Sequence, residues 1–117
     1  MYEYGSLDVT VKDQVATIQM LGHEESRERL RDGRGTKGGR HREMADAMDA
    51  MRGDDDIRVI VLTGKGEHFG ITQTVEEYTN PSHLPVDPAG NWRNFGSIVR
   101  VHQAMVEIEK PIVAKVT

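Results

Sequence analysis

Residues 59–78 read VIVLTGKGEHFGITQTVEEY and hold the first candidate for a binding site in this chain. Apolar residues run directly into Thr-Gly-Lys-Gly, then comes Phe69, and GITQT follows. A buried strand that ends in a loop of this kind raises the question of what the loop holds. The answer depends on the elements that surround the loop.

Side chains that often catalyse reactions are scattered elsewhere along the chain. The five histidines form no HxH or HxxxH pair, so the sequence predicts no metal site. His102 falls among apolar residues at helical spacing, which is more typical of a structural histidine than of a catalytic base. Glu76 and Glu77 are adjacent, and adjacent side chains on a helical turn point apart. We therefore interpret them as solvated residues rather than as a catalytic pair.

The composition sets limits on the class of protein. A chain of 117 residues is long enough for one domain, and a net charge of −4 disfavours a nucleic-acid-binding domain, which is usually basic. The absence of cysteine excludes disulfides and thiolate metal sites. Without a long apolar segment, we expect neither a signal peptide nor a membrane span, and we expect a cytoplasmic protein.

The periodicity of apolar residues predicts an α/β fold. Residues 7–11 and 16–20 alternate on either side of a polar turn, which predicts an antiparallel hairpin. Residues 43–53, EMADAMDAMRG, predict a short helix that Gly53 ends, with apolar side chains at helical spacing, namely Met44, Ala47, Met48 and Met51.

A strand is predicted over residues 57–62, and its continuous apolar character is typical of a strand covered on both faces in a parallel sheet. A second helix is predicted over residues 95–109, with its apolar face formed by Ile98, Val101, His102, Met105 and Ile108. Pro111 ends this helix, and IVAKV begins another strand.

Four segments together resemble the N-terminal portion of the crotonase (enoyl-CoA hydratase/isomerase) superfamily. They read VATIQM, EMADAMDAMRGDDDIRVIVLTGKGEHF, VEEY and VRVHQAMVEIEKPIVAKV. The resemblance implies a partial ββα spiral fold, with an N-terminal hairpin and helices packed on a mostly parallel sheet. The chain would be truncated before the family's Gly-rich turn, so that residues 1–117 form a single partial domain.

The resemblance also implies a use for the loop after the strand. In the family, a backbone N–H of this loop donates to the thioester carbonyl of an acyl-CoA and stabilises the enolate-like oxygen. An ungapped alignment gives this catalytic role to the N–H of Gln73. Gly70, Ile71 and Thr72 would contact the coenzyme A moiety, which enters as part of the substrate, and no further cofactor is implied.

The loop departs from the family pattern at three positions. Ile71 replaces Ala, Thr72 replaces Gly, and Thr74 replaces Asp. A β-branched Thr is penalised where a positive φ is required, so a reshaped loop without an oxyanion hole is the alternative.

Residues 22–42 are the other departure, because they are rich in Gly and Arg and nearly free of apolar side chains. This composition predicts a flexible insert. Two interpretations of its charges remain open: the cations contact coenzyme A phosphates, or they form a solvated surface with the interleaved acids. These cations are Arg27, Arg29, Arg31, Arg34, Lys37, Arg40 and Arg42.

The resemblance implies an enoyl-CoA hydratase or isomerase of fatty acid metabolism. In the family the acid/base glutamates and the second oxyanion donor lie beyond the segments matched here, so we expect weak or no activity from this chain alone. We expect a homo-oligomer, or a partner chain that supplies the missing half. The alternative function is a non-catalytic module whose residues 27–42 bind RNA or an acidic protein.

Overall fold

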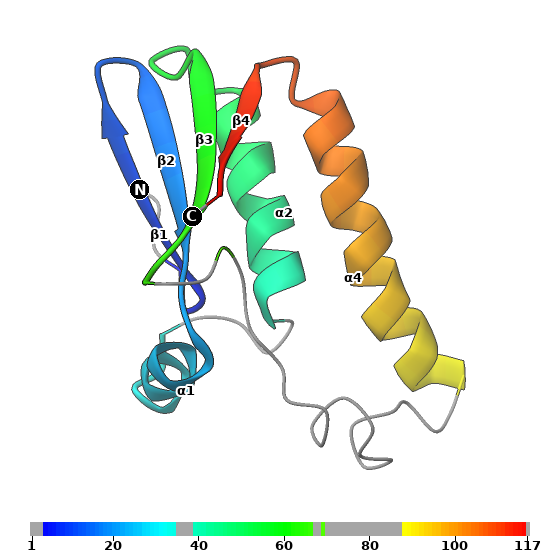
Figure 1. Ribbon diagram of the computed structural model, residues 1–117. Helices are drawn as coiled ribbons and strands as arrows, with labels where there is room; N and C mark the ends of the chain where they lie inside the picture. Colours follow the sequence, from blue (N-terminus) through cyan, green and yellow to red (C-terminus); the bar gives the residue numbers. More distant parts are fainter. Residues whose placement is uncertain (1–3, 35–38, 67–68, 70–87, 117) are drawn as a thin grey trace.

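The strands form a single sheet, and two long helices lie on one side of it (Figure 1). The computed structural model describes residues 4–34, 39–66, 69 and 88–116. In chain order, the elements are β1 (Leu7–Lys12), β2 (Val15–Met20), α1 (His23–Arg31), α2 (Gly39–Arg52), β3 (Val59–Gly64), α4 (Pro88–Glu107) and β4 (Ile112–Lys115). This arrangement confirms the predicted α/β class.

The sheet has the strand order β1-β2-β3-β4, and only the first pair is antiparallel. The hairpin of β1 and β2 is confirmed, and its two turn residues, Asp13 and Gln14, have φ values of 52° and 67°. Two successive left-handed residues are typical of the tight turns whose twist matches that of antiparallel strands. From β2 onward the strands are parallel, so their carboxyl ends lie at one edge of the sheet.

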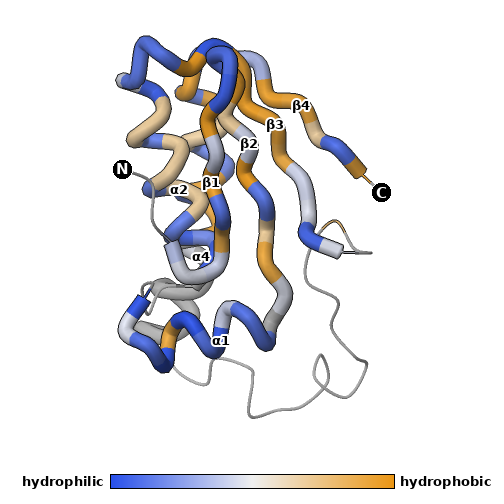
Figure 2. The backbone as a smooth tube through the Cα atoms, turned by 90° about the vertical axis from the view of Figure 1, so that its left-hand side faces the viewer, coloured by the Kyte–Doolittle hydropathy of each residue, from blue (hydrophilic) through white to orange (hydrophobic). Residues whose placement is uncertain are grey.

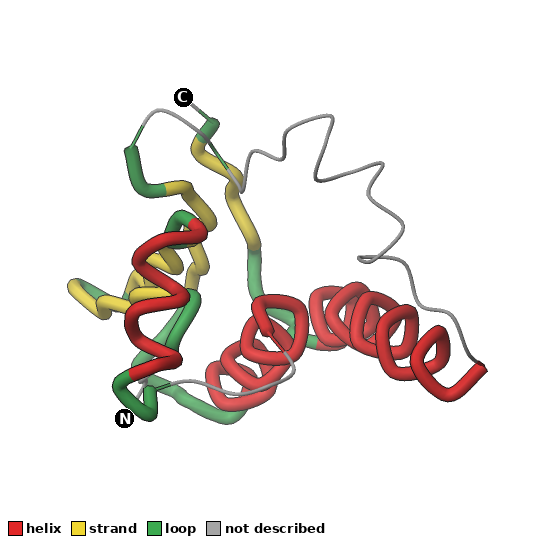
Figure 3. Tube along the Cα trace, turned by 90° about the horizontal axis from the view of Figure 1, so that it is seen from below, coloured by secondary structure: helices red, strands yellow, loops and turns green. Residues whose placement is uncertain are grey.

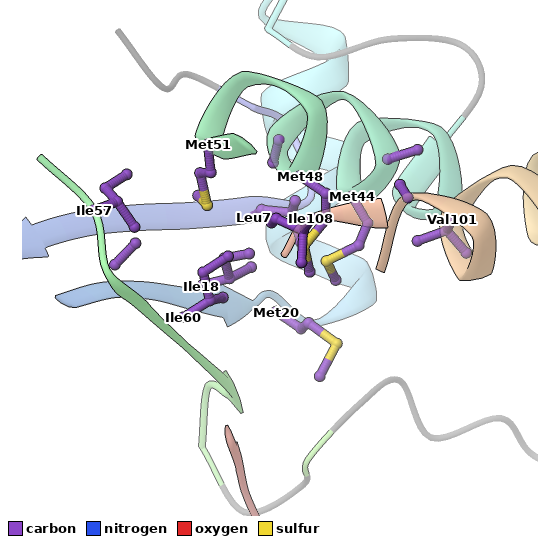
Figure 4. Close-up of a cluster of buried hydrophobic side chains, with 14 residues drawn as sticks. Leu7, Ile18, Met20, Met44, Met48, Met51, Ile57, Ile60, Val101 and Ile108 are labelled. Carbon is purple, nitrogen blue, oxygen red and sulfur yellow. The ribbon is translucent and has the colours of Figure 1, made fainter. Parts of the chain in front are cut away.

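Helix α2 supplies the central layer of the core. The four residues predicted to face inward, from Met44 to Met51, are all at most 6% exposed. They pack with Ile18 of β2 and Ile60 of β3, both fully buried, as the close-up of this cluster shows (Figure 4). The apolar spacing thus predicted the face of the helix, although α2 begins at Gly39, four residues before the predicted start at Glu43.

Helix α4 packs along α2 rather than on the sheet, as the view from below shows (Figure 3). Val101 and Ile108 are buried, as predicted. On the outside, Arg100 forms ion pairs with Asp46 at 2.8 Å and Asp49 at 2.9 Å. His102 is exposed, so its assignment to the apolar face is wrong. Ala104, which was not assigned to that face, is buried together with Val101 and Ile108.

One face of the sheet is open in the part of the chain that the structure describes. Val61 of β3 and Val113 of β4 are paired in register, and Val113 is 52% exposed. Val59 and Val61 of β3 are themselves half-buried, and residues 70–87 lie outside the described part of the chain, so the predicted cover of residues 57–62 on both faces stays a prediction. The apolar run that led to it is visible along β3 (Figure 2). A second layer would be needed to cover the face of the sheet that carries Val61 and Val113, because helices α2 and α4 both lie on the opposite side of the sheet.

Helix α1 lies where the sequence predicted a flexible insert, and it is hydrophilic along almost its whole length (Figure 2). Within residues 22–42, predicted as a flexible insert, the structure has helix at residues 23–31 and in the first turn of α2, and the flexibility of the insert stays a prediction. The helix has acids in its first turn, Glu24 and Glu25, and bases in its last, Arg29 and Arg31. This order of charges favours a helix, because it opposes the helix dipole.

We expect Met48→Ala to lower the free energy of unfolding by about 2–5 kcal/mol, because it leaves a cavity in the core layer. Val106→Ala is the matched control, because Val106 is 84% exposed on α4 and its truncation leaves no cavity. Urea unfolding followed by circular dichroism measures both variants. Equal losses in the two variants would contradict the assignment of Met48 to the core.

Candidate functional site

The carboxyl ends of the parallel strands are the place where this fold collects groups for binding. Met20 at the end of β2 pairs with Gly64 at the end of β3, and Thr63 pairs with Lys115 at the end of β4. In open α/β sheets, ligands bind in the crevice outside the carboxyl ends of the strands. We call this edge, formed by the ends of β2, β3 and β4, the carboxyl edge.

The loop that follows β3 is held at both ends of its described part. The N–H of Lys65 donates to the carbonyl of Met20 at 2.9 Å, which extends the sheet by one hydrogen bond. Gly66 has φ of +87°, a left-handed conformation that glycine adopts without a steric penalty. Phe69 packs against the hydrophobic core. The chain therefore reaches residue 70 from an anchored position beside the carboxyl edge.

The four site residues expected from the sequence, Gly70, Ile71, Thr72 and Gln73, lie outside the described residues. Their roles stay predictions. Phe69, the last described residue before them, connects this segment directly to the core.

A buried carboxylate lies close to the start of β1 at the same edge. Glu43 of α2 is 2% exposed and accepts hydrogen bonds from the N–H of Gly5 at 2.7 Å and the N–H of Ser6 at 3.1 Å. It also accepts one from the hydroxyl of Ser6 at 2.7 Å. Hydrogen bonds to an ionised group are stronger than neutral ones, so Glu43 fixes the chain where it enters β1.

Arg40 lies one turn before Glu43 on α2. Its guanidinium donates to the carbonyl of Leu21, which directly follows β2. Burial lowers the pKa of Arg40, and the charge of Glu43 partly opposes this effect. The start of α2 is thus tied to both β1 and the end of β2.

Arg29 of α1 makes a third connection to this edge. Its side chain is 14% exposed and forms an ion pair with Asp8 of β1 at 2.8 Å. It also donates to the backbone carbonyls of Tyr4 and Leu7 at 3.2 and 3.4 Å. The hydrogen bond to Asp8 raises the pKa of Arg29.

Sequence reasoning did not identify these internal contacts, because it assigned the charged residues of the segment either to an external partner or to a solvated surface. A signal was present for Glu43, which lies four residues before Ala47 and eight before Met51, on the row that faces the core. No comparable signal marks Arg29 or Arg40. Their partners lie about 20 residues away along the chain.

These contacts reduce the number of cations in residues 22–42 that are available to an external partner. Arg29 and Arg40 are engaged within the protein, while Arg27, Arg31 and Arg34 are exposed. The exposed cations leave both contact with phosphates and a solvated surface as hypotheses. Binding of RNA or an acidic protein through residues 27–42 also remains a hypothesis, with fewer free cations than the sequence implied.

The described ranges contain neither a candidate metal site nor a helix that could span a membrane. Within them, no three side chains of His, Asp or Glu lie in a group that could hold a metal ion. None of the helices in those ranges combines the length and hydropathy needed to cross a membrane.

Comparison with known proteins gives structural neighbours only. No protein-family model matches the sequence, and no curated protein matches it either. One similar solved structure is an enoyl-CoA hydratase/isomerase from Pseudoalteromonas atlantica T6c, with 25% identity and a TM-score of 0.58. The match covers 95% of this chain and 38% of that one.

Two further structures resemble the chain more closely in backbone geometry. An enoyl-CoA hydratase/isomerase from Mycobacterium paratuberculosis has 18% identity and a TM-score of 0.69, over 97% of this chain and 42% of that one. A β-diketone hydrolase from Anabaena sp. PCC 7120, bound to (S)-3-oxocyclohexyl acetic acid, has 20% identity and a TM-score of 0.65, over 97% and 41%. The chain thus spans about 40% of the length of the structures it matches.

We expect Glu43→Ala to lower the free energy of unfolding by about 3 kcal/mol, because it leaves buried donors of Gly5 and Ser6 without an acceptor. Arg42→Ala, an exposed neighbour on the same helix, is the control and is expected to change stability by less than about 0.5 kcal/mol. Chemical denaturation measures both. A loss in Glu43→Ala no larger than in the control would show that this carboxylate does not hold β1.

Proposed function

We propose that this chain, whose fold is that of the N-terminal portion of the crotonase (enoyl-CoA hydratase/isomerase) superfamily, binds an acyl-CoA thioester at its carboxyl edge. The fold is common to the neighbours, whereas the ligand is our inference. The proposal concerns binding first, because no residue of the chain matches an acid/base glutamate of the family.

The observation that carries the proposal is the placement of the loop after β3. This loop leaves the carboxyl edge beside Met20, turns at Gly66 and returns to the core at Phe69. The next residues are those that the family resemblance assigns to the thioester. A loop anchored in this way can hold backbone donors in a fixed direction, which is what stabilisation of an oxyanion requires.

The chemistry would use backbone groups. The N–H of Gln73 would donate to the thioester carbonyl oxygen as negative charge develops on it, and the carbonyl of Ile71 would face the adenine. Thr72 and Gly70 would shape the contact with coenzyme A. A donor aimed at developing charge favours the transition state over the ground state, and therefore contributes to turnover more than to binding.

We also infer that this chain acts together with a second chain, either another copy or a partner that completes the site. The face of the sheet that the described helices leave uncovered supports this inference, since Val113 of β4 is 52% exposed there beside Val61 of β3. Apolar surface of this kind commonly marks an interface. Membership of fatty acid metabolism follows only if the ligand is a fatty acyl-CoA.

The test compares Gln73→Pro with Gln73→Ala. Proline has no backbone N–H, whereas alanine keeps it, so the pair separates the backbone donor from the side chain. We expect Gln73→Pro to weaken binding of crotonyl-CoA by about 3- to 10-fold, the effect of one hydrogen bond, and Gln73→Ala to bind like the original chain. If turnover is measurable, the proline variant should lose about 10²- to 10³-fold.

Isothermal titration calorimetry measures the binding, with free coenzyme A and a simple β-diketone as competing ligands. The diketone is included because one structural neighbour is a β-diketone hydrolase. Equal affinities of Gln73→Pro and Gln73→Ala for crotonyl-CoA would contradict the proposal that the Gln73 N–H donates to the thioester. Binding of the diketone but not of crotonyl-CoA would replace the acyl-CoA proposal by a different substrate class.

A further inference from the structure

An ion pair connects α1 to the first residue of the loop after β3. The ammonium group of Lys65 lies 3.0 Å from each carboxylate oxygen of Glu25. The side chains are 47% and 35% exposed, so the pair is partly shielded from water. It joins residues 40 positions apart in the sequence.

Glu25 is itself held in place from the other side. Arg29, one turn further along α1, lies 3.4 Å from Glu25 and 2.8 Å from Asp8. It is also bonded to two carbonyls at the start of β1, as described above. The four side chains Asp8, Arg29, Glu25 and Lys65, which we call the edge network, thus form a chain of contacts from β1 through α1 to the loop.

The edge network bears on local geometry more than on overall stability. Isolated surface ion pairs contribute little to stability, and each member except Arg29 is at least 35% exposed. At Lys65, however, the side chain is held by Glu25 while the backbone N–H is held by Met20. A residue held at both groups has few orientations left, and Gly66, the flexible next residue, starts from that fixed point.

From this geometry we propose that Glu25 and Arg29 are positioning residues for the loop after β3, and that α1 is thereby a functional part of the carboxyl edge. The predicted flexible insert accordingly has a structural role at the site. Its consequence for ligands rests on the proposed function: a fixed starting point at Lys65 leaves the following residues fewer conformations to lose when an acyl-CoA binds. The position of Lys65 itself does not rest on it.

The test compares Glu25→Gln with Glu28→Gln in the whole chain. Both positions lie on α1 and both changes remove one negative charge, but the structure gives Glu28 no ion pair among the residues it describes. Amide hydrogen exchange at Lys65 and Gly66 is the first readout, and crotonyl-CoA affinity is the second. We expect Glu25→Gln to accelerate amide exchange at Lys65 and Gly66 about 3-fold and to weaken crotonyl-CoA binding about 3-fold, while the unfolding midpoint stays unchanged. Glu28→Gln should change neither the exchange rate nor the affinity.

The salt dependence of amide exchange tests the ion pair of Glu25 and Lys65 independently of the substitutions. Raising NaCl from 0.05 to 0.5 M screens exposed charges, so it should accelerate exchange at Lys65 in the original chain but not further in Glu25→Gln. Identical exchange in Glu25→Gln and Glu28→Gln would overturn the positioning role. Faster exchange in Glu25→Gln together with no binding of crotonyl-CoA by the original chain would support positioning and overturn the proposed function. Faster exchange with unchanged affinity would overturn the link between them.

Discussion

The burial of one face of α2 is the constraint on which the rest of this structure depends. The sheet and α4 both pack against this helix, so its methionines Met44, Met48 and Met51 lie at the centre of the core. Methionine is unbranched and fills irregular space between layers, which suits a helix between two different partners. The same helix extends its inward row to Glu43 and so determines where β1 begins.

The carboxyl edge shows how charged residues become structural once the chain folds. Glu43 and Arg40 hold the two ends of the hairpin to α2, and Arg29 holds α1 to the hairpin. These charged groups stabilise the fold through hydrogen bonds rather than through burial of apolar surface. Each satisfies backbone groups that would otherwise lose their partners at the end of the sheet, where the regular ladder of hydrogen bonds stops.

The proposed acyl-CoA site and the proposed role of α1 meet at one short stretch, Thr63 to Gly66. On one side it continues β3, with the hydroxyl of Thr63 bonded to the carbonyl of Lys115 of β4 at 3.1 Å. On the other side it continues into the loop that the family resemblance assigns to the thioester. A binding loop next to a rigid strand is a common arrangement, because the strand supplies position and the loop supplies donors.

The α/β class, the hairpin, and the inward faces of α2 and most of α4 could be predicted before the structure was known. These features follow from the spacing of apolar residues, which reflects the local period of helix and strand. The crotonase resemblance was likewise readable from the segment around β3, and it is confirmed at the level of fold. The helical conformation of α1 and the network of Arg29, Glu25 and Lys65 became visible only in the folded chain. The physical reason is that the partners of these charged side chains lie 21 to 40 positions away in the sequence and come close only when the chain folds.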